Sequence, residues 1–360
     1  MELLWFFPTS GDGRYLGTTK GERKVDLPYL KELAQAVDSL GFRGGLVPTG
    51  QGCEDAWVVA SSLVSVTKNM DFLIALRPGL MAPTLAARMT ATFDHISDGR
   101  LLVNIVTGSD PGEHLADGIH LNHRERYELT EEFLHVYTKV LNGEEVDFEG
   151  KYLNHKGAKN FKAHVQTPYP PVYFSGSSDI ALEIAAKYAH VYLTWGEPPA
   201  LVKEKIDRVK ELAKEQGRDI KFGIRLNIVV RETEEEAWQA ANELIKYVEE
   251  DKVKAMRERL TKQESVGQQR LNTLHNGQKE NLEVSPNLWA GLGLVREGAA
   301  TALVGDPETV AARLIEYHEL GIDQFILSGY PHLEEAHRVA ELLFKHLPLN
   351  QNDKKPQVIY

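Results

Sequence analysis

The chain has 360 residues, of which 42% are hydrophobic and 26% are charged, proportions typical of a globular protein in water. Its formal net charge of -11 argues against nucleic acids and anionic membranes as partners. The single cysteine, Cys53, excludes an intramolecular disulfide and a cysteine-based zinc site. With no signal-peptide pattern and no apolar run long enough to cross a bilayer, the sequence predicts a cytoplasmic protein.

Short apolar runs alternate with amphipathic stretches along the whole chain. The apolar runs predict eight strands, mostly rich in aliphatic or β-branched residues, as expected for strands that are buried on both faces. These strands cover residues 3–7, 44–47, 72–76, 101–106, 172–174, 191–193, 222–230 and 324–327. The amphipathic stretches predict helices, among them residues 30–40, 56–67, 83–96, 124–141 and 201–215.

This repeated alternation predicts an α/β fold with a parallel sheet, and eight units favour closure into a single (β/α)8 TIM barrel. An open, doubly wound sheet is the alternative that periodicity leaves open. No linker divides the chain, so we predict one domain over residues 1–349, followed by a polar tail over residues 350–360.

Two segments are longer than ordinary loops. Residues 144–171 are expected to form an excursion with short strands of its own. Residues 249–305 form the longer segment, in which residues 262–281 are dense in Gln, Asn, Lys and Glu. We interpret this second segment as a mobile lid, with a solvated surface loop as an equally supported alternative.

In a barrel of this type, the chemistry lies where strands end and loops begin. These junctions hold Gly, Ser, Thr and single aromatic or arginine residues, which suits a pocket formed by backbone and hydroxyl groups. After the fifth strand, residues 175–178 read Ser-Gly-Ser-Ser before a helix start at Asp179, where backbone N–H groups can bind a phosphate. From these residues alone, an ordinary helix cap by Ser178 or Asp179 is the favoured interpretation.

Arg225 lies within an apolar strand, where a lone charge is so costly that it must pair or meet an anion. Strand periodicity places Arg225 and Asn227 on the same face. The competing interpretation is a salt bridge from Arg225 to Asp94 or Asp110. Arg296 follows a glycine-rich run and either reaches inward or stays exposed, as loop arginines usually do.

Other motifs do not hold. Residues 11–17 resemble a dinucleotide-binding loop, but their spacing is wrong and no helix follows. His332 and His337 are separated by five positions and fall on different helical faces, so we predict no metal site and disfavour a metal-dependent hydrolase. Cys53 has no base near it in sequence, and a small buried residue is the commoner role for such a cysteine.

Seven stretches carry a more specific signal: residues 5–9 (WFFPT), 48–50 (PTG) with 53–57 (CEDAW), 106–111 (VTGSDP), 192–199 (YLTWGEPP), 222–226 (FGIRL), 285–291 (SPNLWAG) and 328–336 (SGYPHLEEA). They resemble the FMNH2-dependent alkanesulfonate monooxygenases of the bacterial luciferase-like superfamily. The resemblance runs from about Leu3 to about Leu347. It implies a TIM barrel with insertions, assembled as a homotetramer or dimer. Such enzymes take FMNH2 from a separate NAD(P)H-dependent FMN reductase and use O2 to convert a small anionic alkanesulfonate to an aldehyde and sulfite.

The resemblance also implies roles for individual residues. Those expected to bind the cofactor are Ala75, Leu76, Asn104, Thr107, Tyr127, Gly176, Ser177 and Ser178. Of these, Tyr127, Ser177 and Ser178 hold the FMN phosphate. Those expected around the reacting groups are Arg225, Arg296, Tyr330, Trp195 and Asn227. Those expected near the substrate or in the lid are Thr9, Ser10, Thr49, Cys53, Arg270, Trp289 and His332. Arginine forks suit a sulfonate, and a lid excludes water.

Three places depart from the family pattern. Ser10 and Asn227 stand where the family usually has histidine, and Gln51-Gly52 stands where it usually has Arg-Ser. These departures leave two alternatives open. One is the same flavin chemistry on another organosulfur compound, such as a sulfone. The other is a flavin or deazaflavin oxidoreductase without oxygenase activity.

Overall fold

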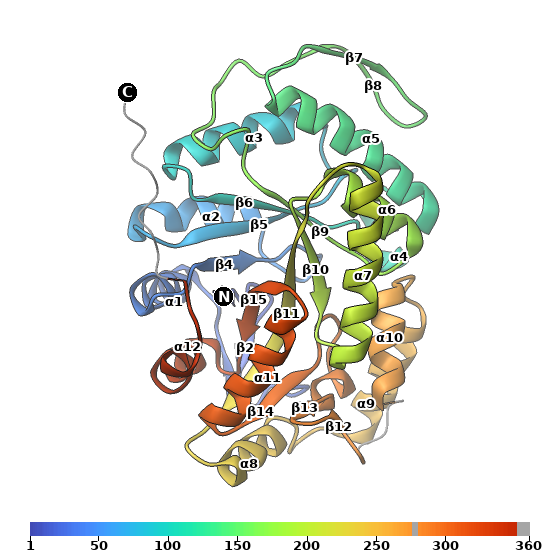
Figure 1. Cartoon of the computed structure of the whole chain (residues 1–360). Helices are drawn as coiled ribbons and strands as arrows, with labels where there is room; N and C mark the ends of the chain where they lie inside the picture. Colours follow the sequence, from blue (N-terminus) through green and yellow to red (C-terminus); the bar gives the residue numbers. More distant parts are fainter. Residues whose placement is uncertain (276–279, 351–360) are drawn as a thin grey trace.

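Eight parallel strands close into a barrel in the computed structural model, which describes residues 1–275 and 280–350 (Figure 1). In order around the barrel, they are β1 (Glu2–Phe6), β4 (Gly44–Val47), β5 (Asp71–Leu76), β6 (Leu101–Ile105), β9 (Val172–Ser175), β10 (Val191–Trp195), β11 (Lys221–Val230) and β15 (Ile322–Ser328). Pairing of β15 with β1 and of β10 with β11 completes the ring. The TIM barrel is therefore confirmed, and the open sheet is excluded.

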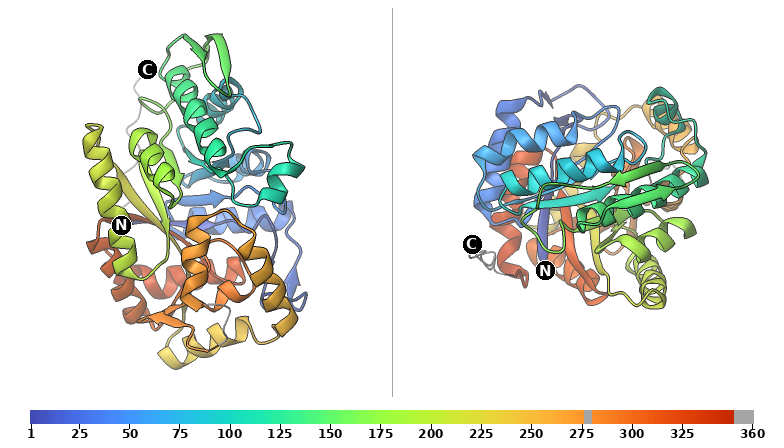
Figure 2. Two further views of the ribbon diagram at one scale, coloured as in Figure 1. Left: turned by 90° about the vertical axis from the view of Figure 1, so that its right-hand side faces the viewer. Right: turned by 90° about the horizontal axis from the view of Figure 1, so that it is seen from above.

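Helices cover the outside of the barrel, as Figures 1 and 2 show. They are α1 (Leu27–Leu40), α2 (Ala56–Leu63), α3 (Pro83–Ile96), α5 (His123–Leu141), α6 (Asp179–Tyr188), α7 (Pro199–Glu215), α8 (Glu234–Leu244), α11 (Pro307–Glu319) and α12 (His332–Leu343). The five predicted helices are confirmed. Three of them, α1, α5 and α7, begin one to three residues earlier than predicted. The predicted helix 56–67 ends earlier, because it tightens after Leu63 into a 3-10 turn, η1 (Val64–Val66). The two valines of that turn are β-branched, a class of residue that is less favourable in an α-helix.

Alternate residues of each strand divide the core into an inner and an outer layer. The inner layer of the barrel contains Leu4, Leu46, Leu73, Leu102, Tyr173, Val191, Leu193 and Ile326. The outer layer packs against the helices and includes Ile224, Leu226 and Ile228 of β11. The residues between them, Arg225 and Asn227, therefore lie on the inner face, where Arg225 is opposite Ile326 of β15.

Both long segments have ordered elements. Residues 144–171 contain a hairpin of β7 (Val146–Glu149) and β8 (Asn154–Ala158), as predicted. Residues 249–305, within their described part, contain α9 (Glu250–Thr261), α10 (Val266–His275), β12 (Glu283–Ser285), β13 (Leu288–Trp289), η2 (Gly291–Leu294) and β14 (Ala302–Gly305). The solvated-loop alternative is therefore wrong there. This insertion (orange) faces the viewer on the left of Figure 2.

The ends of the barrel are closed by short elements. The chain between β1 and α1 forms β2 (Asp12–Gly13) and β3 (Glu22–Arg23), and α4 (Pro111–Ala116) follows β6. At the other end of the chain, after η3 (Phe344–His346), the backbone N–H of Asn350 donates to the carbonyl of Met1 (3.0 Å). Residues 351–360 of the predicted tail lie outside the described residues. Over the part of the chain described, no helix has the length and apolar character needed to cross a membrane.

Candidate functional site

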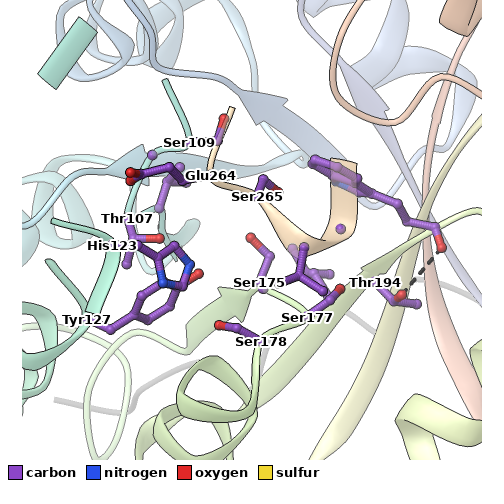
Figure 3. Close-up of a pocket in the computed structure, with 17 residues that line it drawn as sticks. Thr107, Ser109, His123, Tyr127, Ser175, Ser177, Ser178, Thr194, Glu264 and Ser265 are labelled. Atoms are coloured by element: carbon purple, nitrogen blue, oxygen red, sulfur yellow. Dashed lines mark hydrogen bonds between the residues drawn. The ribbon is translucent and has the colours of Figure 1, made fainter. Parts of the chain in front are cut away.

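A cavity of about 660 Å3 opens at the C-terminal ends of β6, β9 and β10 (Figure 3). Its wall consists of residues 106–109 after β6, His123 and Tyr127 of α5, residues 175–178 after β9, residues 193–195 of β10, and residues 264–267 at the start of α10. The position is the one at which TIM barrels carry their chemistry.

Three hydroxyl groups meet in this wall, from Thr107, Tyr127 and Ser178. Burial raises the pKa of Tyr127, while the neighbouring hydroxyls of Thr107 and Ser178 lower it in part. Ser178 is the N-cap residue of α6, but its side chain makes no capping hydrogen bond. Its Oγ is buried and has no hydrogen-bond partner of normal geometry. The ordinary side-chain cap by Ser178 is therefore wrong, and the hydroxyl is free for a ligand.

Gly176 brings the backbone close to these hydroxyls. Its φ of +149° is a conformation that side chains with a Cβ rarely adopt, and an added Cβ would lie 2.9 Å from the Tyr127 hydroxyl and 2.6 Å from Cβ of Ala181. The hydroxyl of Tyr192, in the neighbouring strand β10, donates to the Gly176 carbonyl (2.7 Å) and so holds the loop in place. The loop thus forms a cradle at the N-terminus of α6, where backbone N–H groups favour an anion.

Glu264 also lines this cavity, but its charge is neutralised. The carboxylate pairs with Arg126 of α5 at 2.8 Å. Burial and the same arginine lower the pKa of His123, which stays a neutral donor or acceptor in the wall. The donor set of free hydroxyls and helix N-terminus fits a phosphate group.

Arg225 is a buried cation, 8% exposed, on the inner face of the barrel. Its Cζ lies 3.8 Å from the centre of the Phe6 ring, and neither Nη atom has a hydrogen-bond partner. Both salt-bridge alternatives are wrong. Asp94 accepts the backbone N–H of Val165 (2.6 Å), whereas Asp110 caps α4 and faces Arg259. Within the described chain, no carboxylate forms an ion pair with Arg225.

Arg296 approaches Arg225 from the segment after η2. Its Cζ lies 5.4 Å from the centre of the Tyr330 ring, and it is half-buried, so the exposed-loop alternative is wrong. Burial lowers the pKa of Arg296 to about 10, and burial together with the charge of Arg296 lowers the pKa of Arg225. Two like charges in a desolvated place are unfavourable without an anion between them.

Asn227 is committed to backbone contacts. Its Nδ2 donates to the carbonyls of Ala299 (2.8 Å) and Thr301 (3.0 Å), and its Oδ1 accepts from the Ser328 hydroxyl (2.6 Å). These bonds hold the point at which β11 leaves β10 and pairs with β14 instead. We conclude that Asn227 shapes the barrel wall beside Arg225.

The remaining predicted residues fall into separate places. Ser177 and Trp195 line the cavity, and Gly267 of α10 lies against both. Ala75, Leu76 and Asn104 are buried in β5 and β6 outside that lining, with the Asn104 Oδ1 unpartnered.

Thr9 and Ser10 lie beside the Cys53 thiol and lower its pKa, but burial raises that pKa more. Thr49 is half-buried at the end of β4. Trp289 packs in a second cluster with Leu292 and Ala302, away from the cavity.

Arg270 contacts protein rather than open solvent. Its guanidinium pairs with Glu197 (Nη2 to Oε2, 2.8 Å), and the other oxygen of Glu197 pairs with Lys205 of α7 (2.7 Å). Glu197 is 1% exposed and Lys205 is 5% exposed. This triad ties α10, whose first residues line the cavity, to the end of β10. Sequence reasoning missed Glu197 and Lys205, because a polar helix position shows no sign of a distant partner.

Breaking the triad at Glu197 is expected to destabilise the protein by about 3–5 kcal/mol at pH 7, since it leaves a buried cation without its partner. Burial already lowers the pKa of Lys205, and Glu197 raises it. In Glu197→Gln, that pKa falls further, so stability should rise with pH until Lys205 is neutral in the folded state and in the unfolded chain. Urea unfolding at pH 7 and pH 9.5 measures both effects. Asp207→Asn, which breaks an exposed pair on the same helix, should cost less than about 0.5 kcal/mol.

Residues 1–324 match the family described as luciferase-like monooxygenase. The chain belongs to this family. Three solved structures share its fold: a riboflavin lyase with modified FMN and riboflavin (20% identity, TM-score 0.80, 96% of this chain and 90% of that chain), a long-chain alkane monooxygenase (23%, 0.77, 95% and 90%), and an EDTA monooxygenase from Chelativorans sp. BNC1 (18%, 0.76, 95% and 92%). Their names span different substrates, so this likeness shows a shared fold and indicates no particular substrate.

Proposed function

We propose that this luciferase-like protein is a reduced-flavin-dependent monooxygenase that uses O2 to convert a small alkanesulfonate to an aldehyde and sulfite. The observation that carries the proposal is the pair of Arg225, which is buried, and Arg296, which is half-buried; Arg225 has no ion-pair partner in the described chain. A sulfonate offers oxygen acceptors that match guanidinium forks. A neutral sulfone would leave the charge of Arg225 uncompensated, so the anion is favoured.

The residues of the cavity at the ends of β6, β9 and β10 fit the phosphate group of FMN. Ser177, Ser178 and Tyr127 would hold the phosphate against the cradle at Gly176. Asn104, with its buried and unpartnered Oδ1 on the inner side of β6, is available to the ring system. Reduced flavin, when bound, supplies the electrons with which O2 is activated. We propose that a separate NAD(P)H-dependent reductase delivers it.

The chain itself contributes charge, orientation and a dry site. Arg225 and Arg296, set over the rings of Phe6 and Tyr330, hold the anion in a fixed place. Trp195 and residues 264–267 of the insertion form part of the wall over the flavin cavity. The Arg270–Glu197 ion pair keeps that part of the wall in position. Exclusion of water by this wall would prevent loss of reducing equivalents to free peroxide.

Sulfite release tests the proposal. The protein is supplied with FMN, NADPH, a generic flavin reductase and air, and with alkanesulfonates from methane- to octanesulfonate. We expect sulfite above the control without the enzyme, and no sulfite without O2. Dimethyl sulfone, with formaldehyde and methanesulfinate as the products measured, tests the sulfone alternative, and O2 uptake with reduced FMN tests for an oxidoreductase without oxygenase activity. No sulfite from any sulfonate, in a sample that binds FMNH2, would overturn the alkanesulfonate assignment.

A further inference from the structure

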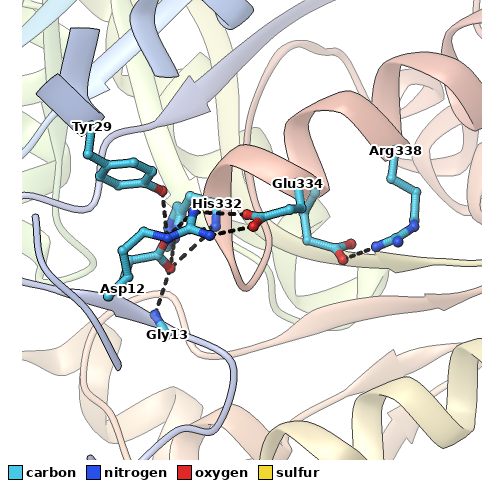
Figure 4. A network of polar contacts seen from close by, with 8 residues as sticks. Asp12, Gly13, Tyr29, His332, Glu334 and Arg338 are labelled. Atoms are coloured by element: carbon cyan, nitrogen blue, oxygen red, sulfur yellow. Dashed lines mark hydrogen bonds and ion pairs between the residues drawn. The ribbon is translucent and has the colours of Figure 1, made fainter. Parts of the chain in front are cut away.

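His332 and Asp12 form a buried pair (Figure 4), and the charges of Arg296 and Arg225 act on His332. His332 begins α12, is 1% exposed, and its Nδ1 lies 2.9 Å from Oδ1 of Asp12. The Tyr29 hydroxyl of α1 donates to Oδ2 of the same carboxylate (2.5 Å), and the backbone N–H of His332 donates to it as well (3.1 Å). Burial raises the pKa of Asp12, but the hydrogen bonds from His332 and Tyr29 lower it by more, so the carboxylate is ionised.

An ionised carboxylate can only accept hydrogen bonds, so it fixes the proton of neutral His332 on Nδ1. The other nitrogen, Nε2, then carries a lone pair. It is buried, and it has no hydrogen-bond partner. The imidazole ring contacts Tyr330 edge to face (centroids 4.7 Å apart) and Phe6 (centroids 5.9 Å apart). These are the same two rings against which Arg296 and Arg225 lie, respectively.

Burial, assisted by two nearby arginines, keeps this imidazole neutral near pH 7. Burial lowers the pKa of His332, Asp12 raises it, and Arg296 and Arg225 lower it again, with a net result below the ordinary value. Arg23 of β3 lies 3.9 Å from Asp12 and pairs with Glu334 of α12, so these two outer charges balance each other. Tyr29 and Tyr330 complete the groups that face the pair.

We infer that His332 is a general base in the proposed reaction and accepts at Nε2 the proton that leaves the substrate carbon bonded to sulfur. Asp12 and Tyr29 act as positioning residues. The inference rests on the proposed function, whose balance is R–CH2–SO3− + O2 + FMNH2 → R–CHO + SO3²− + FMN + H2O + H+. The C–S bond and one C–H bond break, and one oxygen atom becomes the aldehyde oxygen. O2 takes two electrons from the flavin and two from the substrate, and the released proton requires a base.

Nuclear magnetic resonance of the 15N-histidine-labelled protein tests the geometry without turnover. His332→Gln assigns the signals. We expect the Nδ1–H tautomer for His332 in the wild type, with titration below the ordinary histidine pKa of about 6.5. Asp12→Asn should lower that titration further, because the carboxylate that raises it is gone. An Nε2–H tautomer in the wild type would overturn the inference.

Kinetics test the role. His332→Gln and Asp12→Asn should each lower kcat for sulfite release by about 100-fold or more, with FMN affinity unchanged. In the wild type, kcat should fall as pH drops through the His332 pKa, since the base becomes protonated. His332→Gln should remove this acidic limb, and Asp12→Asn should move it to lower pH. A substrate deuterated next to sulfur should show a larger isotope effect in Asp12→Asn than in the wild type.

The chain offers a matched control in His318, which approaches Asp323 at 3.8 Å near the opposite end of β15. His318→Gln should leave kcat and its pH profile as in the wild type. If Asp12→Asn fails to fold, Tyr29→Phe removes one hydrogen bond to Asp12 and should lower kcat by about 5-fold. Sulfite release by His332→Gln at the wild-type rate, with the acidic limb of the pH profile retained, would overturn the assignment of His332 as the general base. No sulfite from the wild type would instead overturn the proposed function.

Discussion

Arg225→Ala is expected to abolish nearly all sulfite release while the barrel stays folded. We expect kcat/KM to fall by about 100- to 1,000-fold, the effect of removing one group that stabilises charge in a dry site. Arg225 is buried without an ion-pair partner in the described chain, and its charge is opposed by Arg296. Removing it therefore relieves a desolvated charge, and the free energy of unfolding should stay within about 1 kcal/mol of the wild type. Sulfite assays and urea unfolding measure the two quantities.

Two further variants make this prediction specific. Arg225→Lys keeps the charge but loses the planar fork, so its activity should fall between the wild type and the alanine variant. Arg231→Ala removes an arginine that follows the end of β11, the strand of Arg225. The guanidinium of Arg231 pairs with the buried carboxylate of Glu335 (3.0 Å). The substitution should cost about 2 kcal/mol, because Glu335 keeps only Arg338 as a partner. An Arg225→Ala protein that unfolds, or that releases sulfite at the wild-type rate, would contradict the proposal that Arg225 binds the sulfonate.

Gly176→Ala should weaken FMN binding by about 100-fold and riboflavin binding much less. The added Cβ would lie 2.6 Å from Ala181 and 2.9 Å from the Tyr127 hydroxyl, so the cradle must shift where the phosphate is expected. Riboflavin lacks the phosphate and depends less on this loop. The backbone strain at positive φ adds about 1–3 kcal/mol of destabilisation. Fluorescence titration with oxidised FMN and riboflavin, read against thermal unfolding, measures the two effects.

Gly217→Ala separates strain from obstruction. Gly217 also has a positive φ (+64°), but nothing lies within 4 Å of the place its Cβ would take. This variant should lose stability to a similar degree and bind FMN as the wild type does. Equal losses for FMN and riboflavin in Gly176→Ala would contradict a phosphate at this cradle.

The sequence alone predicted the eight strands, while closure of the sheet into a barrel was decided by the structure. Strands buried on both faces must be made of apolar runs, and all eight such runs became barrel strands. The polar insertion was less predictable. Residues 262–281 resemble a loop in composition, yet α10 occupies much of this stretch. Its helix is held by tertiary contacts such as Arg270 with Glu197, and composition does not reveal those contacts.

The candidate site divides in the same way. Residues 175–178 by themselves favoured an ordinary helix cap over an anion site, although small residues before a helix can leave backbone N–H groups free. The Ser178 hydroxyl lies instead beside the hydroxyl of Tyr127, which comes from another element, α5, and no local pattern shows that contact. For Arg225, the sequence predicted that a buried charge needs a partner. Only the folded barrel decided that no carboxylate of residues 1–275 and 280–350 forms an ion pair with it.

The fold class and the order of elements were therefore determined by the sequence itself, since hydrophobic periodicity acts between neighbours along the chain. The pairing of His332 with Asp12, 320 positions away, was decided by the tertiary structure. So were the Glu197–Lys205 ion pair and the approach of Arg296 to Arg225. Burial and charge at these places depend on which strand ends meet around the closed barrel, and no local pattern carries that information.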